Sequence, residues 1–333
     1  MSLEKGKPST NESPESFREI SEKMRDVLFG EPSKENLSNI LNLISVAKEI
    51  SPESRQISIQ YAVDHLKSWP DELRLCDGDS EPSWENIFIN GKDADLAVLF
   101  RNLNLRRKNL FYKDKIRHIF SSEEIRNIKI LSLEGVNLNV KIMKELRYLT
   151  ESTKLSQLEV LNVSNNELTE IGANELVKSA SFPDLKELNL ASSFLMGFQS
   201  AKEELGRTEV VKNKGKHILR DVLVRFERLQ SLDLGGNYIG EGLIQMAVES
   251  GQVYRLQKLN LDYSNLGPLD VDLLAKSKSF SNLRELSLRH NDIGIAGAES
   301  LAKSEILSME VKRGLVNQKV ISEELARENG IIT

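Results

Sequence analysis

Apolar residues in this chain recur in an eleven-residue pattern, Leu-x-x-Leu-x-Leu-x-x-Asn-x-Leu, in which other apolar residues sometimes replace leucine. Within each copy the apolar residues alternate with polar ones, which predicts a short strand with one buried face. A pattern repeated along a chain indicates a solenoid, because one unit cannot bury its apolar face without neighbours. The seven copies begin at Phe100, Ile128, Leu158, Leu185, Leu229, Leu256 and Leu283.

The second leucine of each copy measures the length of the repeat. These leucines stand at positions 103, 131, 161, 188, 232, 259 and 286, which are 27 to 30 residues apart except for one interval of 44. The long interval predicts an insertion at 194–226, either a longer helix with a loop or a contact for a partner. A partial unit with a further strand is expected at 306–311.

After each strand the spacing of the apolar residues becomes helical. We therefore expect units of strand, turn and helix, stacked with their parallel strands on a concave face and their helices on the convex side. The predicted fold class is α/β, with a solenoid over 96–315. The helical stripes expected to be buried include Ile171, Leu176 and Val177, and Ile295, Ala298, Leu301 and Ala302.

These copies resemble the leucine-rich repeat, and their period resembles that of its ribonuclease-inhibitor-type subclass. The resemblance implies a horseshoe-shaped solenoid, and we expect a bacterial origin. It also implies that Asn166, Asn237 and Asn291 form the family's asparagine ladder, in which the side-chain amide bonds backbone groups at the turn. Lys108 and Val136 stand in the asparagine position of the first two copies, so those units are expected to be irregular or to act as a cap.

The chain outside the repeats divides into four segments. Residues 1–14 are polar and charged and are expected to be disordered. Apolar residues at helical spacing predict a small all-α domain of three helices over 15–75. A linker and cap is expected at 76–95, with residues 76–83 as a loop and Trp84, Ile87, Phe88 and Ile89 sealing the solenoid. A capping helix is expected at 316–333, ended by Gly330.

Composition narrows the classes of partner. The net charge of −5 and the pI near 5.7 argue against general binding to nucleic acid or to anionic membranes. The sequence has no apolar stretch of the length of a membrane span and no secretory signal in its first thirty residues. One cysteine, Cys76, rules out an internal disulfide. We expect a cytoplasmic monomer, and secretion without a cleaved signal stays open.

No catalytic motif is present. The sequence lacks a phosphate-binding loop, a dinucleotide fingerprint and the His/Cys spacing of a metal site, so neither cofactor nor metal is expected. Cys76 lies among acidic residues, which disfavour a reactive thiolate. We therefore expect that the protein is not an enzyme.

The strand copies leave a candidate binding surface on the concave face. Its middle carries small residues and its ends carry charged ones. The C-terminal end adds a tyrosine beside its arginines, and the contact residues are expected there. Tyr and Arg are residue types enriched at binding hot spots. The candidate partner-binding residues are Asp233, Asp262, Tyr263, Arg289, His290 and Arg313.

A basic run at the other end of the solenoid has two readings. It contains aromatic residues, Phe111 and Tyr112, as a surface for RNA or an acidic partner would. Because the chain is acidic, the preferred reading is a solvated or internally paired charged face. The basic residues are Arg101, Arg106, Arg107, Lys108, Lys113, Lys115, Arg117 and His118.

The leading function predicted is a non-enzymatic scaffold that binds a protein partner through the concave face. A second hypothesis is an adaptor in a ubiquitin-ligase assembly, as for F-box leucine-rich-repeat proteins and effectors that bacteria inject into hosts. Trp69-Pro-Asp-Glu-Leu73 resembles the opening of an F-box, although a polar loop follows it. A third is a GTPase-activating regulator, similar to those of the Ran family, although no long acidic tail follows the repeats.

Overall fold

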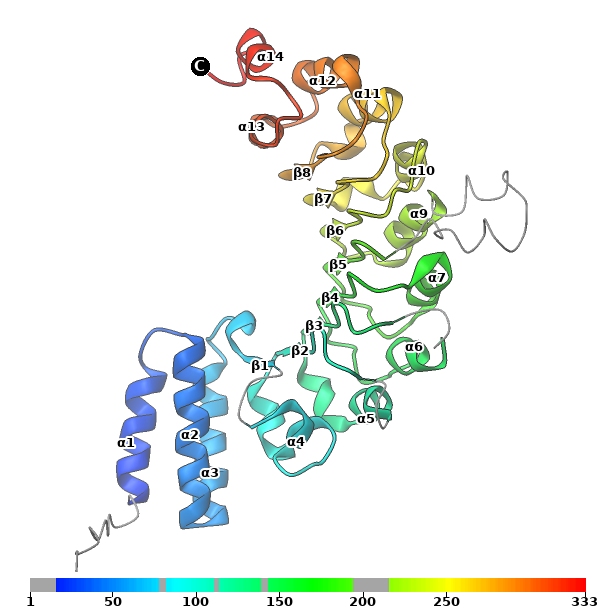
Figure 1. The fold of residues 1–333 in the computed structure, drawn as a ribbon. Coiled ribbons are helices and arrows are strands. Elements are labelled where there is room, and N and C mark those ends of the chain that lie inside the picture. Colours follow the sequence, from blue (N-terminus) through cyan, green and yellow to red (C-terminus); the bar gives the residue numbers. More distant parts are fainter. Residues whose placement is uncertain (1–15, 78–81, 111–113, 139–142, 194–215) are drawn as a thin grey trace, which may run out of the picture.

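The structure is a computed structural model, and it shows a curved open solenoid that begins with a bundle of three helices (Figure 1). The predicted tail at 1–14 and the larger part of the predicted insertion, 194–215, lie outside the described residues. The described residues are 16–77, 82–110, 114–138, 143–193 and 216–333.

A single sheet of eight strands runs along the solenoid in sequence order, and each strand pairs in parallel with the next. In every pairing from β2 onwards, the second leucines of neighbouring copies stand opposite one another, as Leu188 does opposite Leu232 across the 44-residue interval. The predicted α/β solenoid is thus confirmed. The strands are β1 (Leu75–Asp77), β2 (Asn102–Asn104), β3 (Ile130–Ser132), β4 (Val160–Asn162), β5 (Glu187–Asn189), β6 (Ser231–Asp233), β7 (Lys258–Asn260) and β8 (Glu285–Ser287).

The first strand, β1, was not expected. Residues 76–83 were predicted to form a loop, but Cys76 lies in β1 opposite Leu103 and is fully buried. Cysteine packs as a small apolar residue, so it can fill the position that leucine holds in the other strands. The repeat therefore begins before residue 96, and we number the eight units after their strands.

Helices cover the convex side of the sheet, and short 3₁₀ helices lead into several strands (Figure 1). The extra residues of the long interval lie before Lys216, because α9 is the convex helix of its own unit and packs between α7 and α10. The helices are α5 (Lys115–Ser121), α6 (Met143–Thr150), α7 (Thr169–Lys178), α9 (Lys216–Arg225), α10 (Leu243–Glu249), α11 (Pro268–Lys276) and α12 (Gly294–Lys303), with 3₁₀ helices η1 (Asp71–Leu73), η2 (Ala94–Leu99), η4 (Glu123–Asn127), η7 (Val253–Arg255) and η8 (Lys278–Phe280).

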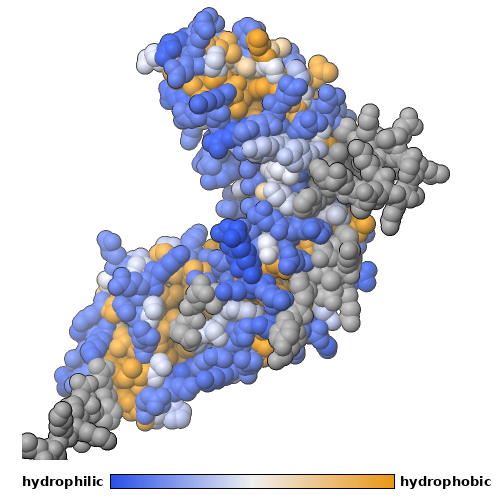
Figure 2. All heavy atoms as spheres, viewed as in Figure 1, coloured by the Kyte–Doolittle hydropathy of each residue, from blue (hydrophilic) through white to orange (hydrophobic). Residues whose placement is uncertain are grey.

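Two residues expected in the buried helical stripes are exposed instead. Ile171 and Ile295 have exposed fractions of 58% and 81%. Ile171 stands directly before Gly172, and Ile295 stands two residues before Gly297. At each glycine the helix lies close to a buried residue of the preceding turn, because an added Cβ would come within 3.1 Å of Leu168 or Ile293. The glycine therefore lies on the buried face of each helix, and the isoleucine lies on the exposed face. In Figure 2 hydrophobic residues reach the surface mainly near the two ends of the molecule.

The three helices predicted in the N-terminal domain are present as α1 (Phe17–Leu28), α2 (Lys34–Ile50) and α3 (Pro52–Leu66). Each begins with a serine whose side chain accepts a hydrogen bond from a backbone N–H of the first turn, and these serines are Ser16, Ser33 and Ser51. A serine cap of this kind is worth about 1 kcal/mol relative to alanine.

The helical domain packs on the cap of the solenoid through α3. Arg55 is buried, and its guanidinium pairs with the carboxylates of Asp95 at 2.7 Å and Asp93 at 3.1 Å, beside and within η2. The hydrogen bond from Arg55 holds the pKa of Asp95 below its ordinary value, against the effect of burial. Trp84 and Phe88 of α4 (Trp84–Phe88) are buried beside η2.

The C-terminal end differs from the prediction. The partial unit expected at 306–311 is wrong, because Ser308 caps a helix, α13 (Met309–Asn317), and a second helix, α14 (Glu323–Glu328), follows it. Gln318 then takes the place of a next strand beside β8. Its Nε2 donates to the Leu286 carbonyl at 2.7 Å, and its Oε1 accepts the Leu288 N–H at 3.1 Å.

Candidate partner-binding surface

Where the strands end, one row of side chains holds the backbone of the following turn. In five units an Asn or Asp oxygen accepts the N–H of the residue two positions later, at 2.9 to 3.0 Å. This is an Asx turn, which closes the chain locally. The side-chain oxygen that makes this bond is therefore already used by the backbone. The residues are Asn104, Asn162, Asn189, Asp233 and Asn260.

Asp262 supplies the same bond to the last unit, where Ser287 replaces the Asn. Its Oδ1 accepts the Arg289 N–H at 2.7 Å and the Ser287 hydroxyl at 2.6 Å. The carboxylate thus holds a turn of the neighbouring unit. Asp233 is held in a similar way by the Gly235 N–H, and burial raises its pKa above the ordinary value, with a further contribution from the charge of Asp262.

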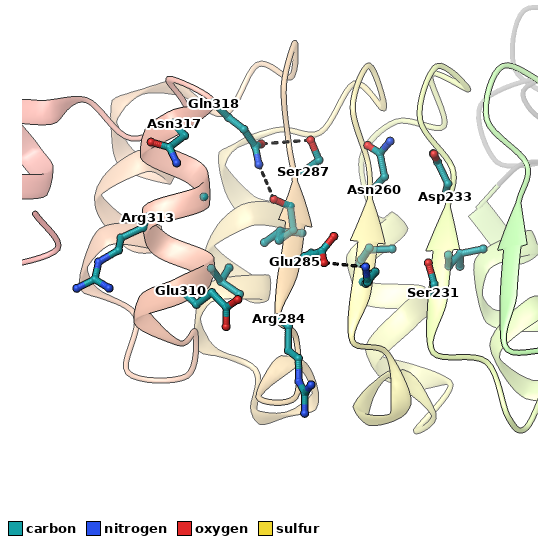
Figure 3. A pocket seen from close by; sticks show the side chains of 16 residues that line it. Ser231, Asp233, Asn260, Arg284, Glu285, Ser287, Glu310, Arg313, Asn317 and Gln318 are labelled. Atoms are coloured by element: carbon teal, nitrogen blue, oxygen red, sulfur yellow. Dashed lines mark hydrogen bonds and ion pairs between the residues drawn. The ribbon is translucent and has the colours of Figure 1, made fainter. Parts of the chain in front are cut away.

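Asp233 and Arg313 line a groove of about 800 Å³ on the concave face, with β6 to β8 as its floor and α13 as one wall (Figure 3). Within it Lys258 and Glu285 pair at 2.7 Å. Arg313 belongs to α13 rather than to a strand, and its Nε donates to the Ile331 carbonyl at 3.3 Å. The structure therefore separates Arg313 from the candidate residues at the strand ends.

The position three residues after this row has a left-handed backbone in units 2 to 8. Gly and Asn tolerate that conformation well, whereas other residues meet a steric cost of roughly 1–2 kcal/mol. Only units 7 and 8 place a ring there, with φ of 50° at Tyr263 and 58° at His290. The full row is Arg107, Gly135, Asn165, Ser192, Gly236, Tyr263 and His290.

The two rings stack on each other. The ring centroids of Tyr263 and His290 are 4.1 Å apart with an interplanar angle of 12°, and Tyr238 lies 6.4 Å from Tyr263 on the other side. Tyr263 and Tyr238 are 41% and 50% exposed. An aromatic strip thus crosses three neighbouring units just beyond their strands.

Arg289 stands beside this strip, and its guanidinium pairs with no side chain in the described parts of the chain. The corresponding arginine of unit 2, Arg106, is instead paired with Glu134 of unit 3 at 2.9 Å. Asn165 donates to the same carboxylate at 3.2 Å. The surface is therefore internally paired at its N-terminal end and open at its C-terminal end. We call Tyr263, Arg289 and His290 the edge cluster.

The three asparagines Asn166, Asn237 and Asn291 lie at the turns that follow the strands. The Asn166 amide donates to the carbonyls of Leu133 and Val163, both at 2.9 Å. Its oxygen accepts the Leu138 N–H at 3.0 Å. Asn237 and Asn291 make equivalent bonds, so each asparagine ties its own unit to the preceding one.

Asparagine and serine alternate along this row. Ser193 and Ser264 fill the position in units 5 and 7 and are fully buried. Each offers its backbone N–H to the asparagine of the next unit, at 2.9 Å to Asn237 and 3.1 Å to Asn291. A serine is therefore tolerated in a unit whose neighbour supplies the amide.

Two family models match the chain, both described as a leucine-rich repeat. One covers residues 157–178, which contain β4 and α7, and the other covers 281–302, which contain β8 and most of α12. Units 4 and 8 of the solenoid thus match the leucine-rich repeat. The comparison with curated proteins found no match.

Among solved structures, an internalin (inlF) from Listeria monocytogenes is similar over 68% of this chain and 81% of its own, with 11% identity and a TM-score of 0.28. A similarity this low carries nothing about partners. A binding surface has to be identified from the geometry of the repeats themselves.

The basic run near the start of the solenoid is partly paired. Arg106 contacts Glu134, and Lys115 pairs with Glu85 and lies over the Trp84 ring. Residues 111–113, which include both aromatics of the run, lie outside the described residues. The paired cations support the reading as an internally paired surface.

The described residues offer little for catalysis. They contain no group of three or more His, Cys, Asp and Glu placed to hold a metal ion. Burial, with a smaller contribution from Asp77, raises the pKa of the Cys76 thiol to about 12, which leaves it without thiolate character. None of the helices in these parts of the chain has the length and apolar character needed to span a bilayer.

Proposed function

We propose that this leucine-rich-repeat chain is a non-enzymatic binding protein whose edge cluster contacts a protein partner. One observation carries the proposal. Along two adjacent rows of equivalent positions, Arg106 and Glu134 of the N-terminal units pair with each other, the middle units carry small residues, and, among the described residues, units 7 and 8 expose stacked rings beside an unpaired arginine. The repeat period and the helical convex side support the ribonuclease-inhibitor-type subclass.

The residue types of the edge cluster support this location. Tyr and Arg dominate binding hot spots because they bury a large area and form directional bonds. Tyr263 and His290 also hold a left-handed backbone that glycine, asparagine or serine holds in units 3 to 6. A steric cost at two exposed positions whose rings pack on each other favours a functional reason for the rings. Asp233 and Asp262, both candidates from the sequence, contribute mainly by holding the turns.

The alternative functions gain no comparable support. Residues 69–73, which resemble the opening of an F-box, contain η1 and lead into β1, whereas the F-box helices would follow that opening. No described feature favours a GTPase-activating role. Monomeric state and cytoplasmic location stay predictions.

Capture of partners from native cells tests the proposal. The test variant is Tyr263→Asn with His290→Asn, because Asn165 shows that asparagine fits this backbone position. The lost stacking, roughly 0.5–1.5 kcal/mol, and the relieved steric cost are of similar size, so the fold should keep its stability. The control is Tyr254→Asn, which removes a tyrosine that is 51% exposed on η7, before the strand of the same unit.

We expect the double variant to lose a captured protein that the wild type and the Tyr254→Asn variant both retain, at unchanged melting temperature. If the double variant keeps every captured protein, the edge cluster is not the contact and the proposal is wrong.

A further inference from the structure

One arginine of the solenoid, Arg106, shows how a guanidinium in the position of Arg289 can be paired. Arg106 of unit 2 and Arg289 of unit 8 are equivalent, each three residues after the central leucine of its strand. Arg106 meets the carboxylate of Glu134, which unit 3 supplies at 2.9 Å and which is only 15% exposed. The carboxylate thus comes from the next unit along the sheet.

Arg289 has no next unit to supply one. The place of a following strand is taken by α13 and Gln318, whose amide binds the backbone of β8. Asp262 lies close by, but its Oδ1 already accepts the Arg289 backbone N–H, and it forms no ion pair with the guanidinium. We propose that an acidic side chain of the protein partner occupies, beside Arg289, the place that Glu134 has beside Arg106. This inference rests on the proposed function.

The neighbouring groups suit a carboxylate. Among the described residues, the Tyr263 hydroxyl and the His290 ring nitrogens have no hydrogen-bond partner, so both can donate to an oxygen placed next to Arg289. In the N-terminal example a second side chain, Asn165 of unit 4, also donates to Glu134, so a carboxylate in this place can accept more than one hydrogen bond. Lys319 follows Gln318 directly and adds positive charge at this end. Charge-assisted hydrogen bonds of this kind are stronger than those between neutral groups.

A titration with defined peptides tests the chemistry without the natural partner. The probe is a fluorescent twelve-residue peptide in which glutamate alternates with alanine, and its counterpart has glutamine in place of every glutamate. Binding to the full chain is measured by fluorescence anisotropy at low salt. Arg289→Gln is the test variant, and Arg106→Gln is the matched control, since that guanidinium is already paired.

We expect the glutamate peptide to bind the wild type and the Arg106→Gln variant equally, and to bind the Arg289→Gln variant at least tenfold more weakly. Equal binding of the glutamine peptide, or unchanged binding to Arg289→Gln, would overturn the inference.

The two proposals fail separately. If the Tyr263 and His290 variant loses its partner but the glutamate peptide does not bind, the partner site stands and its acidic character is wrong. If the peptide binds through Arg289 but no partner depends on the rings, the carboxylate site stands and the proposed function is wrong.

Discussion

Replacing Asn237 with alanine removes the amide that joins unit 6 to unit 5 across the long interval in the sequence. The side chain is 2% exposed. Its oxygen accepts the Ser193 N–H at 2.9 Å, and its nitrogen donates to the carbonyls of Leu190 at 2.9 Å and Leu234 at 2.8 Å. Alanine would leave one buried N–H and two buried carbonyls without these partners.

The magnitude can be worked out from the cost of such groups. A buried polar group left unpaired costs about 1–3 kcal/mol. The N–H has one hydrogen to donate and loses its bond entirely, whereas a carbonyl has two lone pairs and loses less. We therefore expect the free energy of unfolding to fall by about 3 kcal/mol. Because each unit contacts only its neighbours, the loss should be concentrated in units 5 and 6.

Urea unfolding followed by circular dichroism measures the total loss, and hydrogen exchange read by mass spectrometry locates it. Asn237→Ser should lose less than Asn237→Ala, because a serine hydroxyl can donate to one of the freed carbonyls, as Ser193 does to the Val163 carbonyl at 3.4 Å. Asn282→Ala removes an exposed amide that donates to the Tyr254 carbonyl, and it should change stability by less than about 0.5 kcal/mol. An Asn237→Ala loss as small as the Asn282→Ala loss would refute the reasoning.

Arg55→Gln should loosen the helical domain from the solenoid and lower the melting temperature. Because Arg55 holds the pKa of Asp95 below its ordinary value of 3.8, this stabilisation is present at higher pH and is lost as the pH falls through the lowered pKa, so the difference between variant and wild type should shrink in acid. Cys76 should not react with a thiol reagent until the chain unfolds, and fast labelling of the native protein would contradict its burial. Ile295→Ser should leave the free energy of unfolding within about 0.5 kcal/mol, whereas Leu301→Ala should lower it by roughly 2–5 kcal/mol in the same urea titration.

The fold could be predicted from the sequence because the leucines that set the period are also the residues that stand opposite one another in the sheet. Cys76 was missed because it follows Leu75 directly instead of alternating with it, and a polar run, residues 77–83, comes next, although Cys76 stands 27 residues before Leu103, one period away. The strand expected at 306–311 was wrong because Met309 and Val311 alternate as in a strand, while Ser308 caps a helix in the same place.

The candidate site could be predicted only in part. The sequence located Tyr263, Arg289 and His290, since exposed residue types can be read from the repeat. It did not separate them from Asp233 and Asp262, because the hydrogen bonds that hold those carboxylates depend on the backbone of the turn. One signal was available, since glycine and asparagine recur in the position of Tyr263 and indicate a left-handed backbone.

Because of Gln318, the C-terminal segment could close the sheet against strands of other sequence. Gln318 binds β8 mainly through a backbone carbonyl and a backbone N–H, which every strand of the sheet has. Only its 3.3 Å contact with the Ser287 hydroxyl depends on a side chain of the strand. An open strand edge invites pairing with other chains, so a solenoid of any length needs such a stop. Whole units could therefore be added or removed upstream of residue 285 while the same terminal segment closes the array, which makes the number of repeats a design variable.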